Sequence, residues 1–572
     1  MRKPKEYTAL FRSMGAEWKW LLEYISRYRA EVFLYVIIGV LSIGMGLGSS
    51  VASKYLIDAV VSHSNDTIAV TVAAVAGLSV AQIVVGAGAS RISSVVGTRI
   101  NNEIRANIYE HIVLSRWEDI NKYHSGDLIN RLEGDVNTVS GSVISFIPNV
   151  FTKLTQFVGC LVIVLYYDPT MVVFALISAP FLVLSSRFSA KMMRKYNLQS
   201  REMNGKIISF GEESMQNLQT LKAFDLTRRY TENFKVLLQS YRKMRLDYDK
   251  FSIIMSICMS LIGLVVSYSC YGWGVYRLWQ GAISYGTMTL FLQLSGQLTT
   301  SFSSLVSLVP GAISIATAAG RVMEVTALSR EKDSDKDLAE NLLKTASENG
   351  VSVFANGVTY TYDDGEQAVL NEVDFCVSPG ETIAFVGPSG EGKTTLLRLV
   401  LGLVEPDSGK IEMKIGGDTV KISDSTRRFC SYVPQGSAVF TGTVADNLRI
   451  VKSDATEDEM KNALKIADAW SFIEELPMGL NTLIGERGVN FSEGQVQRIS
   501  IARAVLRNAQ VLIMDEATSA LDSKTEDRVL HNLMASNPKR TCILTTHRPS
   551  MLKYCDRVYR IGENGTLEVD KK

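Results

Sequence analysis

The chain has 572 residues, more than a single hydrophobic core usually serves. Charged residues make up 21% of it, yet several stretches of the first half contain almost none, whereas the second half has the composition of a soluble domain. The net charge of +1 gives no reason to expect nucleic acid as a partner, and the seven cysteines show no spacing typical of zinc sites. We therefore expect a multidomain protein whose first half lies in a membrane.

The N-terminal residues 1–29 combine seven Lys or Arg side chains with interleaved aromatic ones. The aromatic residues include Trp18, Trp20, Tyr24 and Tyr28. Such a mixture is typical of a helix that lies in the membrane interface. We predict an elbow helix on the cytoplasmic leaflet; the alternative is a soluble amphipathic helix packed on a core.

Six apolar stretches follow, each long enough to cross about 30 Å of hydrocarbon. They are residues 32–60, 67–90, 143–167, 169–188, 251–277 and 283–315. The short loops after the first and third stretches contain no Lys or Arg, while basic residues crowd the N-terminus and two long connections. By the positive-inside rule, the termini and these connections are cytoplasmic. The sequence thus predicts an all-α, six-helix, multi-pass transmembrane domain over residues 30–324.

The two long connections, residues 91–142 and 189–250, are polar, lack proline and show helical periodicity. Each can form two helix extensions that reach on the order of 35 Å into the cytosol. We expect short coupling helices at the tips, near residues 116–123 and 223–228. Because exposed Trp117 and Phe224 would be unusual in hairpins that contact nothing, we predict that these tips dock on another domain.

Residues 325–350 are polar and charged, so they are predicted to be a linker. A soluble domain is predicted over residues 351–572. Its expected strands are residues 351–354, 373–377, 382–386, 429–433, 511–514 and 542–545. Because helical patterns lie between several of them, they predict an α/β domain with a largely parallel sheet.

One nine-residue stretch of this domain fits the phosphate-binding loop pattern GxxxxGK[ST]. It follows the apolar run 383–386 and precedes the helical pattern 394–401, so backbone N–H groups and a helix N-terminus converge on one concavity. Lys393 would contact the terminal phosphates, and the Thr394 hydroxyl would bind Mg²⁺. The nucleotide-binding residues predicted here are Gly387, Pro388, Ser389, Gly390, Glu391, Gly392, Lys393, Thr394 and Thr395.

Four further motifs lie in the C-terminal part of the chain, after the phosphate loop. Phe491-Ser-Glu-Gly-Gln495 opens a helix, the apolar strand 511–514 runs into Asp515-Glu516, and Ser519-Ala-Leu-Asp522 and Thr545-Thr-His547 come next. Their order and spacing resemble the signature loop, second nucleotide motif, D-loop and H-loop of ATP-binding cassette (ABC) transporters. The resemblance covers the whole chain, because six spans followed by one cassette is similar to an exporter-type half-transporter.

This resemblance implies ATP and Mg²⁺ as cofactors. Tyr362 occupies the A-loop position, where it would stack on adenine, although a core tyrosine is the alternative. Gln435 looks like the Q-loop residue, residues 482–488 look like the X-loop, and Asp522 is the acid of the D-loop. The resemblance further implies a dimer, in which one chain caps the ATP held by Lys393 of the other with Ser492, Gly494 and Gln495. A homodimer is favoured, and a heterodimer stays open.

The catalytic roles can be argued from the side chains. Glu516 would be the general base that accepts a proton from the attacking water, while Lys393 and His547 stabilise charge on the transferred phosphoryl group. A strand end followed by a helix cap is the alternative reading of the acid pair. Magnesium ligands are predicted to be Thr394, Gln435 and Asp515. Glu493 departs from the usual signature glycine, and we predict that it points to solvent or to a basic residue of the partner.

A polar row on the sixth stretch follows heptad spacing and faces either an inner cavity or neighbouring helices. Its members are Gln293, Gln297, Thr300 and Ser304. We predict ATP-driven export of an amphipathic peptide, drug or lipid by alternating access, in the bacterial plasma membrane with the cassette in the cytoplasm. An ATP-gated channel or a regulatory subunit without net pumping is the alternative, which the retained Glu516 and His547 disfavour.

Overall fold

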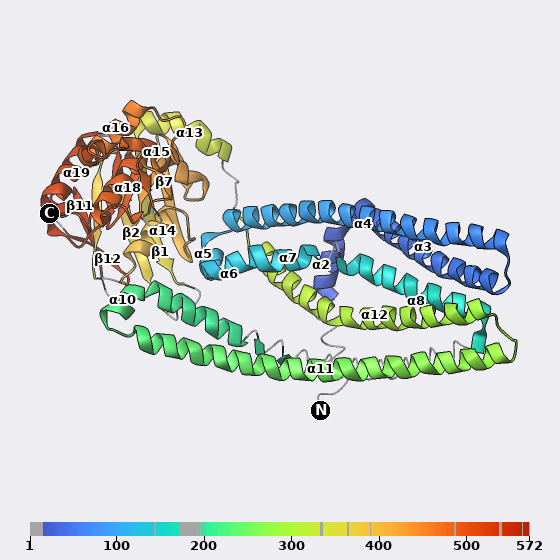
Figure 1. The fold of residues 1–572 in the computed structure, drawn as a ribbon. Coiled ribbons are helices and arrows are strands. Elements are labelled where there is room, and N and C mark those ends of the chain that lie inside the picture. The colour runs from blue at the N-terminus through green and yellow to red at the C-terminus, as the bar shows by residue number, and fades with distance from the viewer. Residues whose placement is uncertain are drawn as a thin grey trace. The chain divides into compact units, whose positions relative to one another are not determined.

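The chain folds into two compact units. The computed structural model describes residues 15–570 apart from 142–144, 171–191, 193–194, 197–198, 201, 332–335, 363–364, 366, 389, 437, 486–487, 537–539 and 563. The helical unit comprises residues 1–113 with 124–327, and the α/β unit comprises residues 114–123 with 328–572. Figure 1 colours the former from blue to yellow-green and most of the latter from yellow to red.

The helical unit contains very long helices, because its apolar stretches run directly into polar helical extensions. In chain order the helices are α2 (Gly15–Ser26), α3 (Arg29–Val61), α4 (Asn65–Leu114), α6 (Ser125–Asn130), α7 (Val136–Gly141), α8 (Ile147–Tyr167), α10 (Leu218–Ala223), α11 (Thr227–Trp279) and α12 (Tyr285–Thr326). A π-helical turn, Arg131–Asp135, joins α6 to α7. The predicted all-α character of this half is confirmed.

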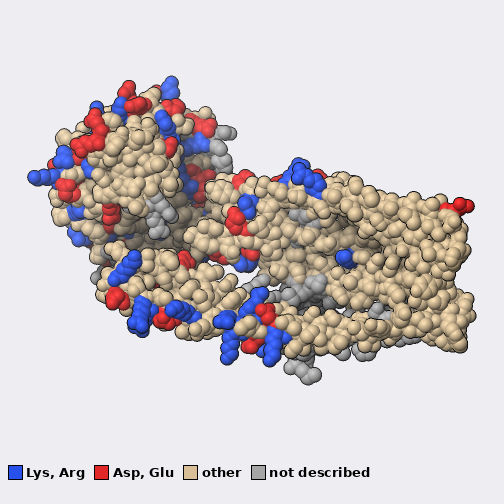
Figure 2. All heavy atoms as spheres, viewed as in Figure 1, with Lys and Arg blue, Asp and Glu red and all other residues tan. Residues whose placement is uncertain are grey.

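Within the described part of the chain, four helices are long and apolar enough to cross a membrane: α3, α4, α8 and α11. Figure 2 shows that long stretches of this unit carry almost no charge on the visible face. Most of the sixth predicted stretch lies in the 42-residue helix α12. The fourth, residues 169–188, lies almost entirely outside the described residues. The number of six spans therefore stays a prediction.

Close helix approach holds α3, α8 and α12 together around a small apolar core that includes Leu47, Cys160 and Leu294. A Cβ on Gly159 of α8 would lie 2.6 Å from Leu47 Cδ1 of α3. Since the glycine leaves that space free, the two helices pack closely, as small residues permit in membrane bundles. The N-terminal helix α2 also packs on α12 and buries Leu21 completely. Its predicted place in the membrane interface stays a prediction.

A polar clasp joins α3 to the start of α12. Asp58 accepts a hydrogen bond from the Gly286 N–H at 2.8 Å and one from the Ser284 hydroxyl at 2.9 Å. Lys54 lies 3.2 Å from the same carboxylate. Because the first N–H groups of a helix lack partners within it, Asp58 serves as a cap supplied by another helix.

The α/β unit has two main sheets. The six-stranded sheet has the order β12-β11-β3-β10-β9-β6, and all its neighbours are parallel except β11 and β12. Its strands are β3 (Thr382–Val386), β6 (Cys430–Val433), β9 (Val511–Asp515), β10 (Thr541–Thr545), β11 (Arg557–Ile561) and β12 (Leu567–Asp570). The predicted α/β fold with a largely parallel sheet is confirmed for this layer.

A second, antiparallel sheet corrects the prediction for the first two strands, which were expected in the parallel sheet. Its order is β2-β1-β4-β5, formed by β1 (Val351–Tyr360), β2 (Leu370–Val377), β4 (Ser408–Ile415) and β5 (Asp418–Lys421). Only nine residues, 361–369, join β1 to β2, which is too few for the crossover that parallel neighbours need. The two strands therefore pair as a hairpin, with Val353 opposite Val377.

Several helices complete the α/β unit. They are α5 (Trp117–Asn121), α13 (Lys336–Asn349), α14 (Lys393–Val400), α15 (Val444–Arg449), α16 (Glu457–Ile466), α17 (Trp470–Glu474), α18 (Glu493–Arg507), α19 (Ser523–Ser536) and α20 (Pro549–Leu552). The short strands β7 (Gly442–Thr443) and β8 (Leu483–Ile484) pair antiparallel. The interpretation of residues 325–350 as a linker without a core role was wrong for α13. Its Leu342 and Ala346, one helical turn apart, are buried in the core of the unit.

The short helix α5 belongs to the α/β unit although it follows α4 in the chain. Two backbone hydrogen bonds join the residues before α5 to the residues after α12. Arg116 N–H donates to Ser329 O at 2.9 Å, and Glu331 N–H donates to Leu114 O at 2.9 Å. Arg427 then binds both carboxylate oxygens of Glu331, at 2.7 and 2.8 Å. Such a bidentate pair is directional, so two of the three connections to the helical unit, those that begin at residues 114 and 328, are anchored at one place.

Candidate nucleotide site

The predicted phosphate loop lies between β3 and α14, at the carboxyl end of its strand. Gly387, Gly390 and Gly392 have φ values of 155°, 95° and 96°, which lie in a region that residues other than glycine rarely adopt. The ammonium group of Lys393 donates to the carbonyl oxygens of Gly387 and Pro388, both at 2.7 Å. The loop therefore curls around its own lysine, which is the first residue of α14.

Lys393 is only 6% exposed. Burial lowers its pKa, while the carboxylates of Glu516, Glu391 and Asp515 oppose that shift. A cation in this setting lacks full hydration, so it gains most from an anionic ligand. Of the other predicted loop residues, Ser389 lies outside the described part, and Thr394 and Thr395 form the first turn of α14.

The acid pair stands where β9 ends, next to the phosphate loop. Asp515 is buried, and one of its oxygens, Oδ1, accepts a hydrogen bond from Thr545 Oγ1 at 2.7 Å. Its other oxygen, Oδ2, is buried and has no hydrogen-bond partner among the described residues. Leaving a charged oxygen in this condition is costly unless a ligand meets it.

Glu516 has a φ of 46°, which is uncommon for a residue other than glycine. Its N–H bonds to Thr545 Oγ1 at 3.0 Å, which holds this turn in place. Each oxygen of its carboxylate has a polar partner. His547 Nε2 lies 2.8 Å from Oε1, and Gln435 Nε2 donates to Oε2 at 2.9 Å. Strained backbone of this kind is found at functional sites, where the surroundings fix a reactive group.

These contacts bring together the three residues predicted from separate motifs, Gln435, Glu516 and His547. The amide nitrogen of Gln435 is directed at Glu516, so magnesium binding through its amide oxygen stays a prediction. Thr394 and Asp515 fit a magnesium ion, because a hydroxyl and a buried carboxylate oxygen without a partner are the hard donors that this ion prefers. The described residues contain no group of three acidic, His or Cys side chains that would hold a metal by themselves.

Tyr362 lies beside α14. Its hydroxyl lies 3.0 Å from Thr395 Oγ1 and accepts a hydrogen bond from Arg398 at 2.8 Å. The ring meets Tyr360 edge-on, with the ring centroids 5.0 Å apart. Tyr362 is thus fixed near the phosphate loop, and its stacking on adenine stays a prediction.

The signature segment begins α18. Ser492 is the N-cap residue, its hydroxyl accepting from Gln495 N–H at 3.3 Å, while Gln495 Oε1 accepts from Ser492 N–H at 2.8 Å. This reciprocal capping box leaves the other first N–H groups of the helix available to an anion. Glu493 is exposed, and its direction relative to a triphosphate bound by the partner stays a prediction.

The D-loop is held by the signature helix on one side. Gln497 of α18 accepts from Ala520 N–H at 3.1 Å and donates to Ser519 Oγ at 3.1 Å. A Cβ on Gly494 would lie 2.9 Å from Ala520 O, so the helix and the loop touch where no side chain fits. Asp522 ends the loop by capping α19, accepting from the N–H groups of Lys524 and Thr525 at 3.0 Å.

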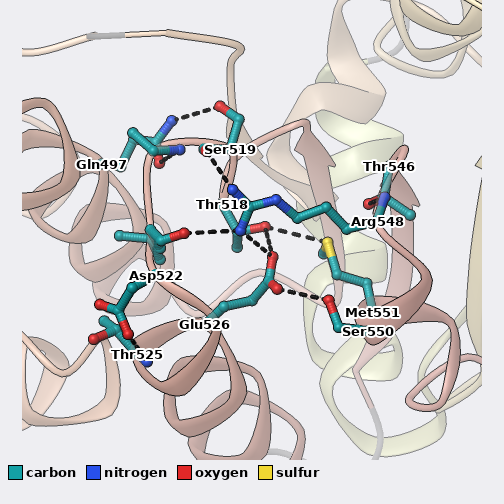
Figure 3. Close-up of polar contacts among 12 residues, drawn as sticks. Gln497, Thr518, Ser519, Asp522, Thr525, Glu526, Thr546, Arg548, Ser550 and Met551 are labelled. Atoms are coloured by element: carbon teal, nitrogen blue, oxygen red, sulfur yellow. Dashed lines mark hydrogen bonds and ion pairs between the residues drawn. The ribbon is translucent and has the colours of Figure 1, made fainter.

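On its other side the D-loop is held by Arg548, the neighbour of His547 (Figure 3). Arg548 donates to Ser519 O at 2.6 Å and to Leu521 O at 2.8 Å. It also contacts buried Glu526 at 3.3 Å, which accepts from the Thr518 hydroxyl at 2.7 Å. Sequence reasoning missed Gln497, Arg548 and Glu526. Only the position of Arg548 directly after His547 could have drawn attention to it.

The polar row on α12 divides between two environments. Gln297 contacts Ser50 of α3 at 3.5 Å and Cys160 of α8 at 3.6 Å, so it joins helices. Gln293 and Thr300 are exposed. Thr300 lines a cavity of about 570 Å³ between α11 and α12, and no other member of the row does. The remaining lining residues are Gly263, Leu264, Tyr268, Tyr271, Leu292, Ser295, Gly296 and Thr299.

A strand, a phosphate loop, a helix and an adjacent carboxylate pair define an ATPase domain of the phosphate-loop class, here joined to a helical membrane domain. Two family descriptions match the chain. The ABC transporter transmembrane region matches residues 32–302, and the ABC transporter domain matches residues 370–519. The protein therefore belongs to the ABC transporters, with an exporter-type half-transporter architecture.

Individual relatives agree. The chain is 27% identical over 557 residues to a putative multidrug export ATP-binding/permease protein of Staphylococcus aureus (strain NCTC 8325 / PS 47), covering 96% of this chain and 95% of that protein. It is 27% identical over 504 residues to a multidrug resistance ABC transporter ATP-binding and permease protein of Lactococcus lactis subsp. cremoris (strain MG1363), covering 87% and 83%. These relatives support a multi-pass protein of the bacterial plasma membrane.

A solved structure shares the fold. It is described as a bacterial Atm1-family ABC exporter with ATP bound, with a TM-score of 0.80, 22% sequence identity and coverage of 94% of both chains. The predicted order of a helical membrane domain and an α/β ATPase domain is thus confirmed, as is the prediction of an ATPase coupled to transport.

Proposed function

We propose that this protein exports an amphipathic substrate by ATP-driven alternating access, as a dimer of two half-transporters. The observation that carries the proposal is the position of Glu516 beside the phosphate loop, with one carboxylate oxygen on His547 and the other on Gln435. A carboxylate oriented in this way can receive a proton from water at a bound γ-phosphate.

ATP would bind with its phosphates in the loop 387–395 and its adenine on Tyr362. Lys393, now bonded to two loop carbonyl groups, would turn its ammonium group to the β- and γ-phosphates. Thr394 and Asp515 would hold magnesium, with Gln435 as a further ligand, and the ion would supply positive charge that neutralises the phosphates. The buried Asp515 oxygen without a partner supports this assignment.

Glu516 would then act as general base. Its strained backbone is held by Thr545, so the carboxylate needs little reorganisation to reach a water molecule in line with the γ-phosphate. His547, which contacts the same carboxylate, would orient Glu516 and stabilise the charge that develops on the transferred group. Retention of both groups supports hydrolysis rather than a purely regulatory role.

The signature helix supports the proposed dimer. The α18 N-terminus offers a second anion site whose ligand would be the γ-phosphate bound by the other chain, so the site of one chain is incomplete. We favour a homodimer, because Ser492 and Gln495 form an intact capping box and Glu493 is exposed.

The second coupling helix was expected near residues 223–228, but α10 ends at Ala223 and α11 begins at Thr227, so a turn occupies most of that tip. We infer that this turn contacts the partner. Phe224, at the C-cap of α10, is 71% exposed. A large exposed aromatic residue at a helix end suits a hydrophobic contact with another chain. We expect Phe224→Ala to reduce transport per ATP hydrolysed about tenfold while the KM for ATP stays within about twofold. Lys222→Ala, at an exposed position of α10 two residues earlier, is the matched control. Unchanged transport in the Phe224 variant would contradict this contact.

The substrate class rests on the 570 Å³ cavity between α11 and α12, whose lining residues are all uncharged. Tyr268 and Tyr271 present aromatic faces with hydroxyl groups, beside Ser295 and Thr299, which favours a substrate with apolar and neutral polar parts. The names of the relatives, which refer to multidrug export, point in the same direction.

Vesicle transport tests the proposal. The chain alone would be reconstituted in liposomes, and uptake of uncharged, cationic and anionic amphipathic dyes would be measured with ATP and with ATP plus a chelator. We expect robust ATPase activity and ATP-dependent uptake of uncharged dyes, reduced at least about tenfold by Tyr268→Ala. An inactive chain that needs a different half-transporter would overturn the homodimer, and ATP-gated dye leak down its gradient would overturn pumping.

A further inference from the structure

Trp117, predicted to dock on another domain, does so within the α/β unit. Its indole is half-buried and packs against the core formed by both sheets. The guanidinium carbon of Arg398 lies 4.6 Å from the centroid of the indole ring. Arg398 stands on α14, the helix that begins with Lys393, so α5 rests on the helix that carries the phosphate loop.

Arg398 also contacts Tyr362, the residue proposed to stack on adenine. The same guanidinium donates a hydrogen bond to the Tyr362 hydroxyl at 2.8 Å. That hydroxyl also lies 3.0 Å from Thr395 Oγ1. One planar side chain therefore touches both Trp117 of α5 and Tyr362, and Arg suits such a double role because its fork is rigid and its face stacks on aromatic rings.

A second contact runs parallel to the first. The Tyr360 hydroxyl donates to Glu118 Oε1 of α5 at 2.7 Å, and the Tyr360 ring stands edge-on to Tyr362. Tyr360 is buried, which makes it a fixed wall rather than a mobile link. Arg398, only partly buried, is the member of the group that can follow a movement of Tyr362.

We propose that Arg398 is a positioning residue that couples adenine binding at Tyr362 to the coupling helix α5 of the same chain. The proposal rests on the function proposed above, since it takes Tyr362 as the adenine contact. When adenine stacks on Tyr362, the tyrosine hydroxyl moves with its ring, the bonded guanidinium follows, and Trp117 feels the change. Because α5 lies between α4 and α6 in the chain, the response has a covalent route to the long helices.

Thermodynamic reciprocity allows the coupling to be measured by changing Trp117 and determining nucleotide affinity. If nucleotide binding changes the environment of Trp117, then a change at Trp117 must alter nucleotide affinity by the same factor. A tryptophan that served only for docking would affect transport and leave the affinity unchanged. The double effect, transmitted through Arg398, distinguishes the two roles.

The test is a double-mutant cycle on the full-length chain in lipid nanodiscs, with Kd measured by calorimetry for adenylyl imidodiphosphate, a non-hydrolysable ATP analogue. Trp117→Leu and Arg398→Ala should each raise Kd about three- to tenfold, the range that one lost charged contact gives. The Kd of the double variant should be no higher than the higher of the two single-variant Kd values. Arg116→Gln is the matched control, because Arg116 precedes Trp117 but pairs with exposed Glu405; its Kd should stay within about twofold.

Two conservative variants guard against mere misfolding. Arg398→Lys keeps a cation over the indole and should give a Kd between those of the parent and Arg398→Ala. Tyr362→Phe keeps the ring but removes the acceptor, and Trp117→Leu should then have no further effect. A Kd for Trp117→Leu within about twofold of the parent, or additive effects in the cycle, would overturn the link. Absence of ATPase activity in the parent chain would instead overturn the proposed function.

Discussion

The two units use polar side chains in different ways. In the α/β unit, hydrogen bonds join segments far apart in sequence, such as Gln435 with Glu516 and Arg548 with the D-loop. In the helical unit, many hydroxyl groups return to their own backbone one turn earlier. Examples are Ser301 to Gln297 O at 2.6 Å and Ser304 to Thr300 O at 2.8 Å. The distribution of charge differs as well: Figure 2 shows charged side chains spread over the α/β unit, whereas long stretches of the helical unit carry almost none on the visible face.

This difference indicates what holds each unit. A hydroxyl that bonds its own helix satisfies itself in an apolar medium but contributes little to the arrangement of helices. The helical unit is therefore arranged by close packing at small residues and by separate long-range polar contacts, such as the Asp58 clasp and the ion pair of Arg131 with Glu324. The α/β unit is arranged by a dense polar network that also positions the reacting groups. A single substitution should then affect chemistry in one unit and packing in the other.

Glu516→Gln should give the largest effect on chemistry. The amide cannot accept a proton, so ATP hydrolysis should fall at least about 100-fold. ATP binding should persist because Lys393 and the phosphate loop are untouched. Phosphate release and nucleotide binding would both be measured. Turnover within about twofold of the parent would contradict the assignment of Glu516 as base.

Arg548→Ala should lower ATP turnover about tenfold, because three contacts that hold the D-loop and Glu526 are lost together. Arg548→Lys keeps the charge but not the forked guanidinium group, so its ATP turnover should lie between those of the parent and Arg548→Ala. Turnover numbers and melting temperatures would be compared. A loss of stability without a change in turnover would show that the D-loop contacts serve folding alone.

Gly286→Ala tests packing in the helical unit. A Cβ there would lie 2.2 Å from the backbone oxygen of Lys54, so α3 and α12 must separate. We expect a cost of about 1–3 kcal/mol, seen as a lower melting temperature of the detergent-solubilised protein. Gly77→Ala on α4 is the matched control, since nothing lies within 4 Å of a Cβ there. Equal melting temperatures for both variants would count against the clasp.

Glu493→Gln should have the smallest effect, with turnover within about threefold of the parent. An exposed carboxylate at the first position of α18 interacts with the helix dipole by only about 0.3–1 kcal/mol. If Glu493 were instead directed at the triphosphate of the partner site, its removal would raise turnover strongly. ATPase activity at low and high salt would distinguish the two arrangements, because salt screens an exposed charge.

The sequence by itself determined the features that depend on contiguous residues. The phosphate loop was predictable because its glycines and lysine act over nine neighbouring positions, and the apolar stretches because crossing a bilayer requires an uninterrupted length. Four strands of the parallel sheet, β3, β6, β9 and β10, were also predictable, since burial on both faces leaves unbroken apolar runs. The strand β11, which contains Arg557 and Arg560, was not predicted. Motif order then indicated Gln435, Glu516 and His547, but not that they touch.

Only the tertiary structure decided which distant segments meet. Gln435 and Glu516 are 81 residues apart, and nothing local records their hydrogen bond. The same holds for α5 in the α/β unit, for the burial of α13, and for Arg398 between Trp117 and Tyr362. The physical reason is that local periodicity reports which face of an element is buried, whereas its partner is chosen by packing across the whole domain.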